Sequence, residues 1–256
     1  MQAQLPEQLK SPRLREIDGD VEIWRAFSRY VFLTVAQASE LLNRNPFTVQ
    51  KRFNKLTKTD PHYLNRERQS EFDEWVYFPA PAGGRKAFDN GFTTSPWSIR
   101  EKAKSHLPHD VMISEFHLKL ELALRGRGLT LSWEQWRDDM DDMKPVIPDA
   151  RFAVEGEAEF TPVENVRARP KNGYKTLIEK MRELEKLDIK RVCWLFPTEE
   201  RRQNLLEALE KEFNTTRFWF TTYDLALHDP LGKIWLTPKN FRERTYGILK
   251  PDTKVE

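Results

Sequence analysis

Polar side chains with hydrogen-bonding or cationic heads recur on one side of the segment 46–58. At helical spacing, Val49, Phe53 and Leu56 share one face, so the remaining polar side chains face the other way. These outward residues are Thr48, Gln50, Lys51, Arg52 and Lys55. Hydroxyl and amide groups can hydrogen-bond to base edges, and lysine and arginine can contact phosphates. The pattern therefore suits a helix that lies in the major groove of a DNA duplex.

Two helices must precede this segment to hold it in place. Residues 21–32 carry an apolar stripe, which predicts the first helix. Thr34 and Gln37 have the spacing of a capping box, which predicts the start of a short second helix. After a tight turn, Asn45 can cap the third helix, and Pro46 can occupy its first position, where no amide hydrogen is needed.

Two strand-like runs, 63–66 and 75–78, follow the helices and predict a hairpin, the wing. Arg66 and Arg68 would lie on or near it and contact backbone phosphates. Three helices and a hairpin predict a winged helix-turn-helix. Its candidate DNA-binding residues are Asn45, Thr48, Gln50, Lys51, Arg52, Lys55, Arg66 and Arg68. The alternative is a winged helix that binds another protein, because a fold does not fix a function.

The region from 106 to 236 alternates between helix and strand patterns. The predicted order is helix, three strands, helix, strand, helix, strand. Asp149 follows Pro148 where the second strand begins, and Glu164 lies near the end of the third. This order and these two acids resemble the core of the PD-(D/E)xK nuclease-like fold. The resemblance implies an α/β restriction-endonuclease-like domain, with a mixed sheet flanked by helices.

In that fold, the two carboxylates lie side by side and share a divalent cation. The cation, Mg or Mn, polarises a phosphate and activates a water. Glu115, on the preceding helix, could add a third carboxylate. The resemblance therefore implies Glu115, Asp149 and Glu164 as metal ligands.

The same fold places a lysine two residues after the glutamate, where this chain has Val166. Lys175 or Lys180, on the following helix, could substitute for it. We assign Asp149, Glu164 and Lys175 as the candidate catalytic residues. Both acids also suit ordinary roles, as a strand-opening turn residue and a strand residue at an exposed edge. We therefore expect a degenerate domain without enzymatic activity and without a cofactor, unless the site is active with Mg or Mn.

Four stretches together resemble the replication-relaxation family of plasmids and mobile elements. They are Thr34–Leu56, His109–Glu115, Pro148–Ala150, and Phe160–Glu164 with the lysine-containing helix after it. The resemblance spans roughly residues 21–196 and implies DNA binding in plasmid replication, mobilisation or their control. The family usually has an acidic residue two positions after the strand glutamate, followed by Arg-Gly. Here the run is Glu-Asn-Val-Arg, which argues against inherited catalytic chemistry.

The bulk composition excludes several classes of protein. A hydrophobic fraction of 39% with 32% charged residues indicates a folded chain rather than a disordered one. The single cysteine, Cys193, excludes a disulfide framework and a cysteine-cluster zinc site, and favours a reducing, cytoplasmic location. We expect it to be a core filler. No bilayer-spanning run or signal segment is evident. The net charge is +2, so phosphates would be attracted by local basic patches.

We predict an α+β protein with two domains. The first is the winged helix-turn-helix DNA-binding domain, residues 20–91, and the second is the nuclease-like domain, residues 106–236. The tail from Pro238 onward lacks apolar periodicity and is expected to be peripheral. Basic residues of the second domain would add a DNA-binding surface or a dimer interface: Arg167, Arg169, Lys171 and Lys175.

The leading hypothesis is a DNA-binding protein of a plasmid or mobile element that controls replication, mobilisation or transcription. Its expected partners are double-stranded DNA and a second copy of the chain, with no membrane. One alternative is a metal-dependent DNA endonuclease that uses Asp149 and Glu164. The other is a protein-binding adaptor.

Overall fold

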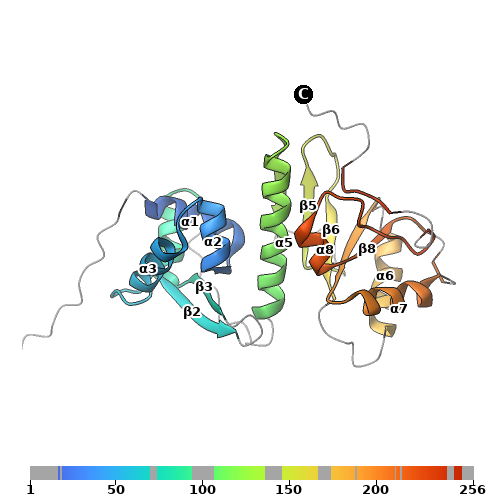
Figure 1. Cartoon of the computed structure of the whole chain (residues 1–256), viewed down its shortest axis with the longest axis horizontal. Helices are drawn as coiled ribbons and strands as arrows, with labels where there is room; N and C mark the ends of the chain where they lie inside the picture. Colours follow the sequence, from blue (N-terminus) through green and yellow to red (C-terminus); the bar gives the residue numbers. More distant parts are fainter. Residues whose placement is uncertain are drawn as a thin grey trace, which may run out of the picture. The chain divides into compact units, whose positions relative to one another are not determined.

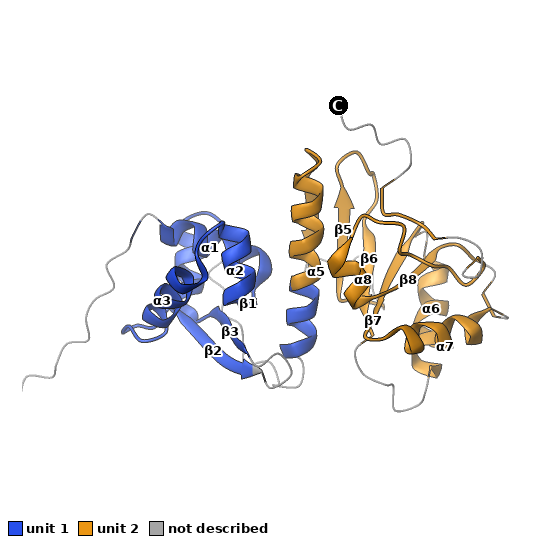
Figure 2. Ribbon diagram, viewed as in Figure 1, with its two compact units in different colours: residues 1–114 blue, residues 115–256 orange. Residues whose placement is uncertain are grey.

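The chain divides into two compact units, residues 1–114 and 115–256 (Figures 1 and 2). The computed structural model describes residues 17, 19–69, 74–93, 107–135, 146–166, 174–187, 189–210, 212–213, 215–240 and 245–249. Unit 1 combines helices with a small antiparallel sheet, and unit 2 has a five-stranded mixed sheet with helices. The predicted α+β class is confirmed. Within the described ranges, no helix has both the length and the apolar character needed to cross a membrane.

Unit 1 contains the predicted three helices and the hairpin, with one further strand and one further helix. The elements are α1 (Gly19–Tyr30), β1 (Leu33–Thr34), α2 (Val35–Leu42), α3 (Pro46–Leu56), β2 (Leu64–Gln69), β3 (Glu74–Pro79) and α4 (Pro81–Asp89). The sheet has the order β1-β3-β2, and both pairings are antiparallel. Helix α5 (Leu107–Arg125) begins in unit 1 and ends in unit 2.

Local capping sets the start of α2 and of α3. Thr34 Oγ1 accepts from the Gln37 amide at 3.2 Å, and the Gln37 side chain accepts from the Thr34 amide at 2.9 Å. This capping box is the one that the sequence predicts. Asn43 ends α2 in the left-handed region, with φ of 49°. Asn45 then caps α3, with Pro46 at its first position.

The inward side of α3 is anchored in an aromatic core. The Phe53 ring lies 5.5 Å from that of Phe27 on α1 and 4.9 Å from that of Tyr77 on β3. Val49 and Leu56 are also buried, as their helical spacing predicts. Burial of these side chains fixes which side of α3 faces away from the unit.

Unit 2 is built on the sheet β4-β5-β6-β7-β8. Besides its part of α5, its elements are β4 (Leu131–Glu134), β5 (Ala150–Val154), β6 (Thr161–Asn165), α6 (Lys175–Lys186), β7 (Val192–Phe196), α7 (Glu199–Leu209), β8 (Phe218–Thr222) and α8 (Tyr223–His228). The first two pairings are antiparallel and the last two are parallel. Helices α6 and α7 supply the crossovers that parallel pairing requires.

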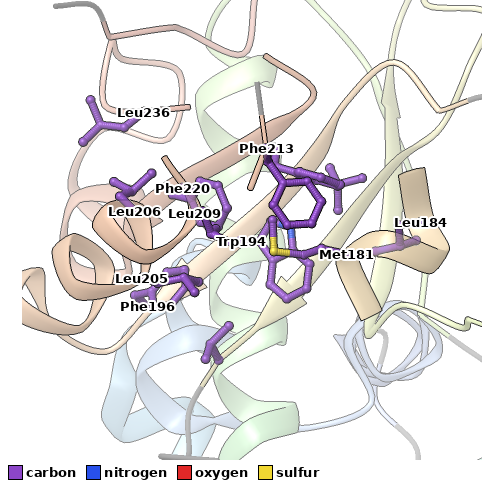
Figure 3. Packing of buried hydrophobic residues seen from close by; sticks show 13 residues of the cluster. Met181, Leu184, Trp194, Phe196, Leu205, Leu206, Leu209, Phe213, Phe220 and Leu236 are labelled. Carbon is purple, nitrogen blue, oxygen red and sulfur yellow. The ribbon is translucent and has the colours of Figure 1, made fainter. Parts of the chain in front are cut away.

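The core of unit 2 joins α6, α7, β7 and β8 (Figure 3). Trp194 and Phe196 of β7 are buried in it with Met181 of α6 and Leu205 of α7. Cys193 is buried on the same strand, and burial raises its pKa to about 12. A thiol so rarely ionised is a poor nucleophile, which agrees with a packing role.

The C-terminal segment differs from the prediction that everything after Pro238 is peripheral. Ile248 is buried, and its carbonyl accepts a hydrogen bond from Arg191 at 2.8 Å. Tyr246 forms an isolated bridge with Trp235. The few apolar residues of this segment follow no helix or strand period, so the sequence could not predict this contact.

Candidate nucleic-acid interface

Helix α3 presents an exposed polar surface opposite its buried side. Thr48, Gln50, Lys51 and Lys55 are all exposed, as the sequence predicts. A helix turns about 100° per residue, so these four side chains lie on the half of α3 that is opposite Val49. We term these four residues, together with Phe47, the outer face of α3.

Asn45 has a structural task at the start of this helix. Its side-chain oxygen accepts from the Phe47 amide at 2.9 Å, and the residue is exposed. The cap fixes the first turn of α3, where a groove-binding helix would meet base edges.

Arg52 does not lie on the outer face. Its Nε donates to Asp20 Oδ1 at 2.7 Å, and a second guanidinium nitrogen contacts Asp20 Oδ2. The Asp20 side chain is 0% exposed and that of Arg52 is 10% exposed. Arg52 lies only roughly 60° from Val49 around the helix, so it borders the buried stripe. The placement of Arg52 among outward residues is therefore corrected, because its charge pairs α3 with α1.

Arg66 connects the hairpin to α3. It donates to Asn54 Oδ1 at 2.9 Å, and its guanidinium lies 4.4 Å from the centre of the Trp75 ring. Tyr77 also donates to Asn54 Oδ1, at 3.4 Å. Arg66 is exposed despite these contacts, and so is Arg68, two residues along the same strand. Since alternate residues of a strand share a side, both arginines project from one side of β2.

One exposed residue on α3 was not among the predicted site residues. Phe47 is 75% exposed, more than any other large hydrophobic residue of the described chain. Its position, two residues before Val49, places it roughly 160° from the buried stripe. The helical pattern alone could have indicated this, because Phe47 lies outside the apolar stripe of Val49, Phe53 and Leu56.

In unit 2, Asp149 immediately precedes β5, and Glu164 lies on the neighbouring strand β6. Ala150 of β5 pairs with Val163 of β6. In an antiparallel pair, the residue before Ala150, Asp149, therefore comes next to the residue after Val163, Glu164. Asp149 Oδ2 accepts from the Asn165 amide at 2.8 Å. Glu164 is buried. The structure thus places the two predicted carboxylates at the same end of the β5–β6 pair.

The lysine beside Glu164 is Lys180. Its Nζ lies 2.6 Å from Glu164 Oε1 and donates to the Ile147 carbonyl at 3.3 Å. Lys180 also lines an open depression of about 750 Å³. The side chain of Lys175, the candidate catalytic lysine, is 76% exposed. Its Nζ lies 4.0 Å from Glu179 Oε1 instead. Of the two lysines considered, the structure places only Lys180 with Glu164.

Glu115 accepts a hydrogen bond from Tyr223 at 3.3 Å. Burial, followed by the charge of Glu115, raises the pKa of Tyr223 well above its usual value. In the parts of the chain that the structure describes, no three His, Cys, Asp or Glu side chains are grouped to hold a metal ion. Glu115, Asp149 and Glu164 therefore do not form such a group. Arg167, Arg169 and Lys171 lie outside the described residues.

A sequence profile described as Replication-relaxation matches residues 26–202. This range is more than half of the 256-residue chain, and it covers α3, the hairpin, the carboxylates and Lys180. No curated protein matches the chain. The match confirms the resemblance that the sequence analysis identified.

Proposed function

Because this chain belongs to the replication-relaxation family, we propose that it is a duplex-DNA-binding protein of a plasmid or other mobile element. It controls replication, mobilisation or transcription by binding a specific DNA site. Unit 1 acts as a winged helix-turn-helix, in which α2 and α3 form the helix pair and β2 and β3 form the wing. Unit 2 is a nuclease-like domain that has lost catalysis.

One observation carries this proposal, the outer face of α3. Lys51 and Lys55 lie one turn apart and are exposed on it, while Thr48 and Gln50 offer hydrogen-bonding groups beside them. The opposite side of the helix is fixed in the core by Phe53. A rigid helix with cations and base-reading groups on its free side has the properties that binding in a major groove requires.

The hairpin adds a second point of contact. Arg66 and Arg68 are exposed on β2, and the Arg66–Asn54 hydrogen bond fixes that strand to α3. Cations on both elements would contact phosphates on either side of the groove. Each phosphate contact releases counterions, so the affinity should fall steeply with salt.

The test is a salt titration of duplex binding by the full chain, using duplexes selected from a random pool. Lys51→Ala should weaken binding and reduce the slope of log K against log salt by about 1. Lys186→Ala is the matched control, because it removes the same charge from the exposed surface of α6. Equal slopes for wild type and Lys51→Ala would contradict the role of α3. Absence of binding at low salt would favour the protein-binding adaptor.

We propose further that the chain binds as a homodimer. Two winged helices related by a two-fold axis would meet half-sites about one helical turn apart. The selected duplexes test this directly. Inverted repeats with that spacing support the dimer, and a single half-site with a monomeric complex in light scattering excludes it.

A second candidate function is metal-dependent DNA cleavage. It is favoured by the contact between Lys180 and Glu164, opposite Asp149, since a lysine beside two carboxylates is the arrangement that the nuclease-like fold implies. Asp149 and Glu164 would hold the Mg or Mn ion, which would polarise the phosphate and activate a water. The fit is incomplete, because the described residues supply no third ligand of the His, Cys, Asp or Glu type.

Plasmid incubated with the protein and Mg²⁺ or Mn²⁺ decides between the two functions. Nicking by the wild type that Asp149→Ala abolishes would establish the nuclease, provided that Asp224→Ala, at an exposed residue of α8, leaves it intact. Intact plasmid in all three reactions, together with retained DNA binding, supports the non-catalytic function.

A further inference from the structure

Phe47 is an exposed aromatic residue at the centre of the outer face of α3. The other described phenylalanines of unit 1 are buried or half-buried: Phe27, Phe32, Phe53, Phe78, Phe88 and Phe92. A lone exposed apolar side chain is common on protein surfaces and indicates nothing by itself. Phe47 differs from such a residue in its position on α3 and in the residues around it.

Cations and polar groups surround Phe47 on the helix. Lys51 follows it by one turn, Lys55 by two, and Gln50 lies three residues after it, so all three share its side of α3. A surface for an ordinary apolar partner would not place two lysines beside its only aromatic ring. An anionic partner that also offers an apolar group would suit all of these side chains together.

The backbone at Phe47 is held before any partner arrives. Its amide donates to the Asn45 side chain at 2.9 Å, and Pro46 precedes it at the first helical position. Phe47 therefore lies in the capped first turn of α3, the part of a groove-binding helix that meets base edges. A side chain on a pre-organised turn loses little backbone entropy on binding.

We propose that Phe47 is a specificity residue that contacts the C5-methyl group of a thymine in the major groove. Of the four unmodified bases, thymine displays an apolar group in that groove, its C5-methyl. Phenylalanine is among the side chains that contact this methyl group. Thr48 and Gln50 read polar base edges next to it, and Lys51 contacts phosphate. This inference rests on the proposed function, because it requires that α3 enters the groove of a duplex.

The experiment removes the methyl group without changing base pairing. A duplex selected by the full-length protein is remade with deoxyuridine in place of thymine, one position at a time. Loss of one buried methyl contact should weaken wild-type binding about fourfold at the contacted position. Phe47→Ala should bind thymine and deoxyuridine duplexes equally at that position. Leu225→Ala removes an exposed apolar side chain from α8 and should keep the wild-type difference.

The outcomes separate this inference from the proposed function. If the wild type binds no duplex, both fail. If it binds but Phe47→Ala keeps the full thymine preference at every position, the role of Phe47 is wrong and the DNA-binding function stands. A change of oligomeric state in Phe47→Ala, with an unchanged thymine preference, would assign the ring to a contact between protein chains and overturn the inference.

Discussion

The polar residues of α3 and the carboxylates of unit 2 differ in how much of them is free to meet a ligand. On α3, four of the five polar side chains that the sequence predicts to face outward are exposed. The two carboxylates of unit 2 instead contact other residues of unit 2. Lys51 and Lys55 point into solvent. Glu164 is buried against Lys180, and Asp149 accepts from the Asn165 amide. The residues of α3 were candidates for contact with nucleic acid because of residue type and spacing, and the carboxylates because of the resemblance to the nuclease-like fold. The difference is that charges satisfied inside the fold are less available to a ligand.

Arg52 belongs with the internal set although it lies on α3. The Arg52–Asp20 pair is removed from water and is made of two hydrogen-bonded contacts. Asp20→Ala should destabilise unit 1 by about 3–5 kcal/mol, because it leaves a buried guanidinium uncompensated. Hydrogen exchange of residues 19–56 in the full chain measures this effect.

Glu22→Ala is the matched control for that substitution. Glu22 pairs with Arg44, but its side chain is 54% exposed. Its loss should cost less than about 1 kcal/mol. Equal effects of the two substitutions would show that Arg52 is not held as a buried partner, and would return it to the candidate DNA contacts.

The next largest effect concerns the two lysines of α6. Lys180→Met should lower the free energy of unfolding by about 1.5–3 kcal/mol, because the buried Glu164 carboxylate loses a charged partner. Lys175→Met should change it by less than about 0.5 kcal/mol, since Lys175 is 76% exposed. Urea denaturation of both variants checks the difference. If Lys180→Met leaves the free energy of unfolding unchanged, this lysine is not needed for stability. That result would favour the nuclease.

These lysines show what the sequence pattern of α6 predicts and what it does not. Lys175 and Lys180 lie on opposite flanks of the apolar stripe of α6, at roughly 120° and 100° from Met181. Periodicity therefore predicts the helix and its buried side, but not which flank turns toward β6. That choice depends on how α6 packs on the sheet, which no local pattern contains.

The same limit applies in unit 1. The capping box at Thr34, the cap at Asn45 and the buried Val49 are local features, and the structure confirms each of them. Arg52 borders the apolar stripe, and its partner, Asp20, is 32 residues away in the chain. A non-local ion pair of this kind leaves no spacing signal.

Arg66 tests whether the hairpin acts with α3 or independently of it. Arg66→Lys keeps the charge but loses the fork geometry toward Asn54 and the Trp75 ring. We expect about fivefold weaker duplex binding, the equivalent of about 1 kcal/mol, with a nearly unchanged salt slope. Arg68→Lys, on the same strand, serves as the comparison and should bind as the wild type does. Similar losses in both variants would indicate that only the charge of the hairpin matters.

The smallest expected effect is the most direct test of the division between the two sides of α3. Phe47→Ala should change the free energy of unfolding by less than about 0.5 kcal/mol, because the ring is 75% exposed and no apolar area is lost from the core. Phe53→Ala, on the same helix, should cost about 3–5 kcal/mol, because it removes a fully buried ring from between Phe27 and Tyr77. Thermal unfolding of the two variants measures both effects. A large loss for Phe47→Ala would mean that its ring stabilises the folded chain, and the exposed outer face could then not be treated as a surface reserved for a ligand.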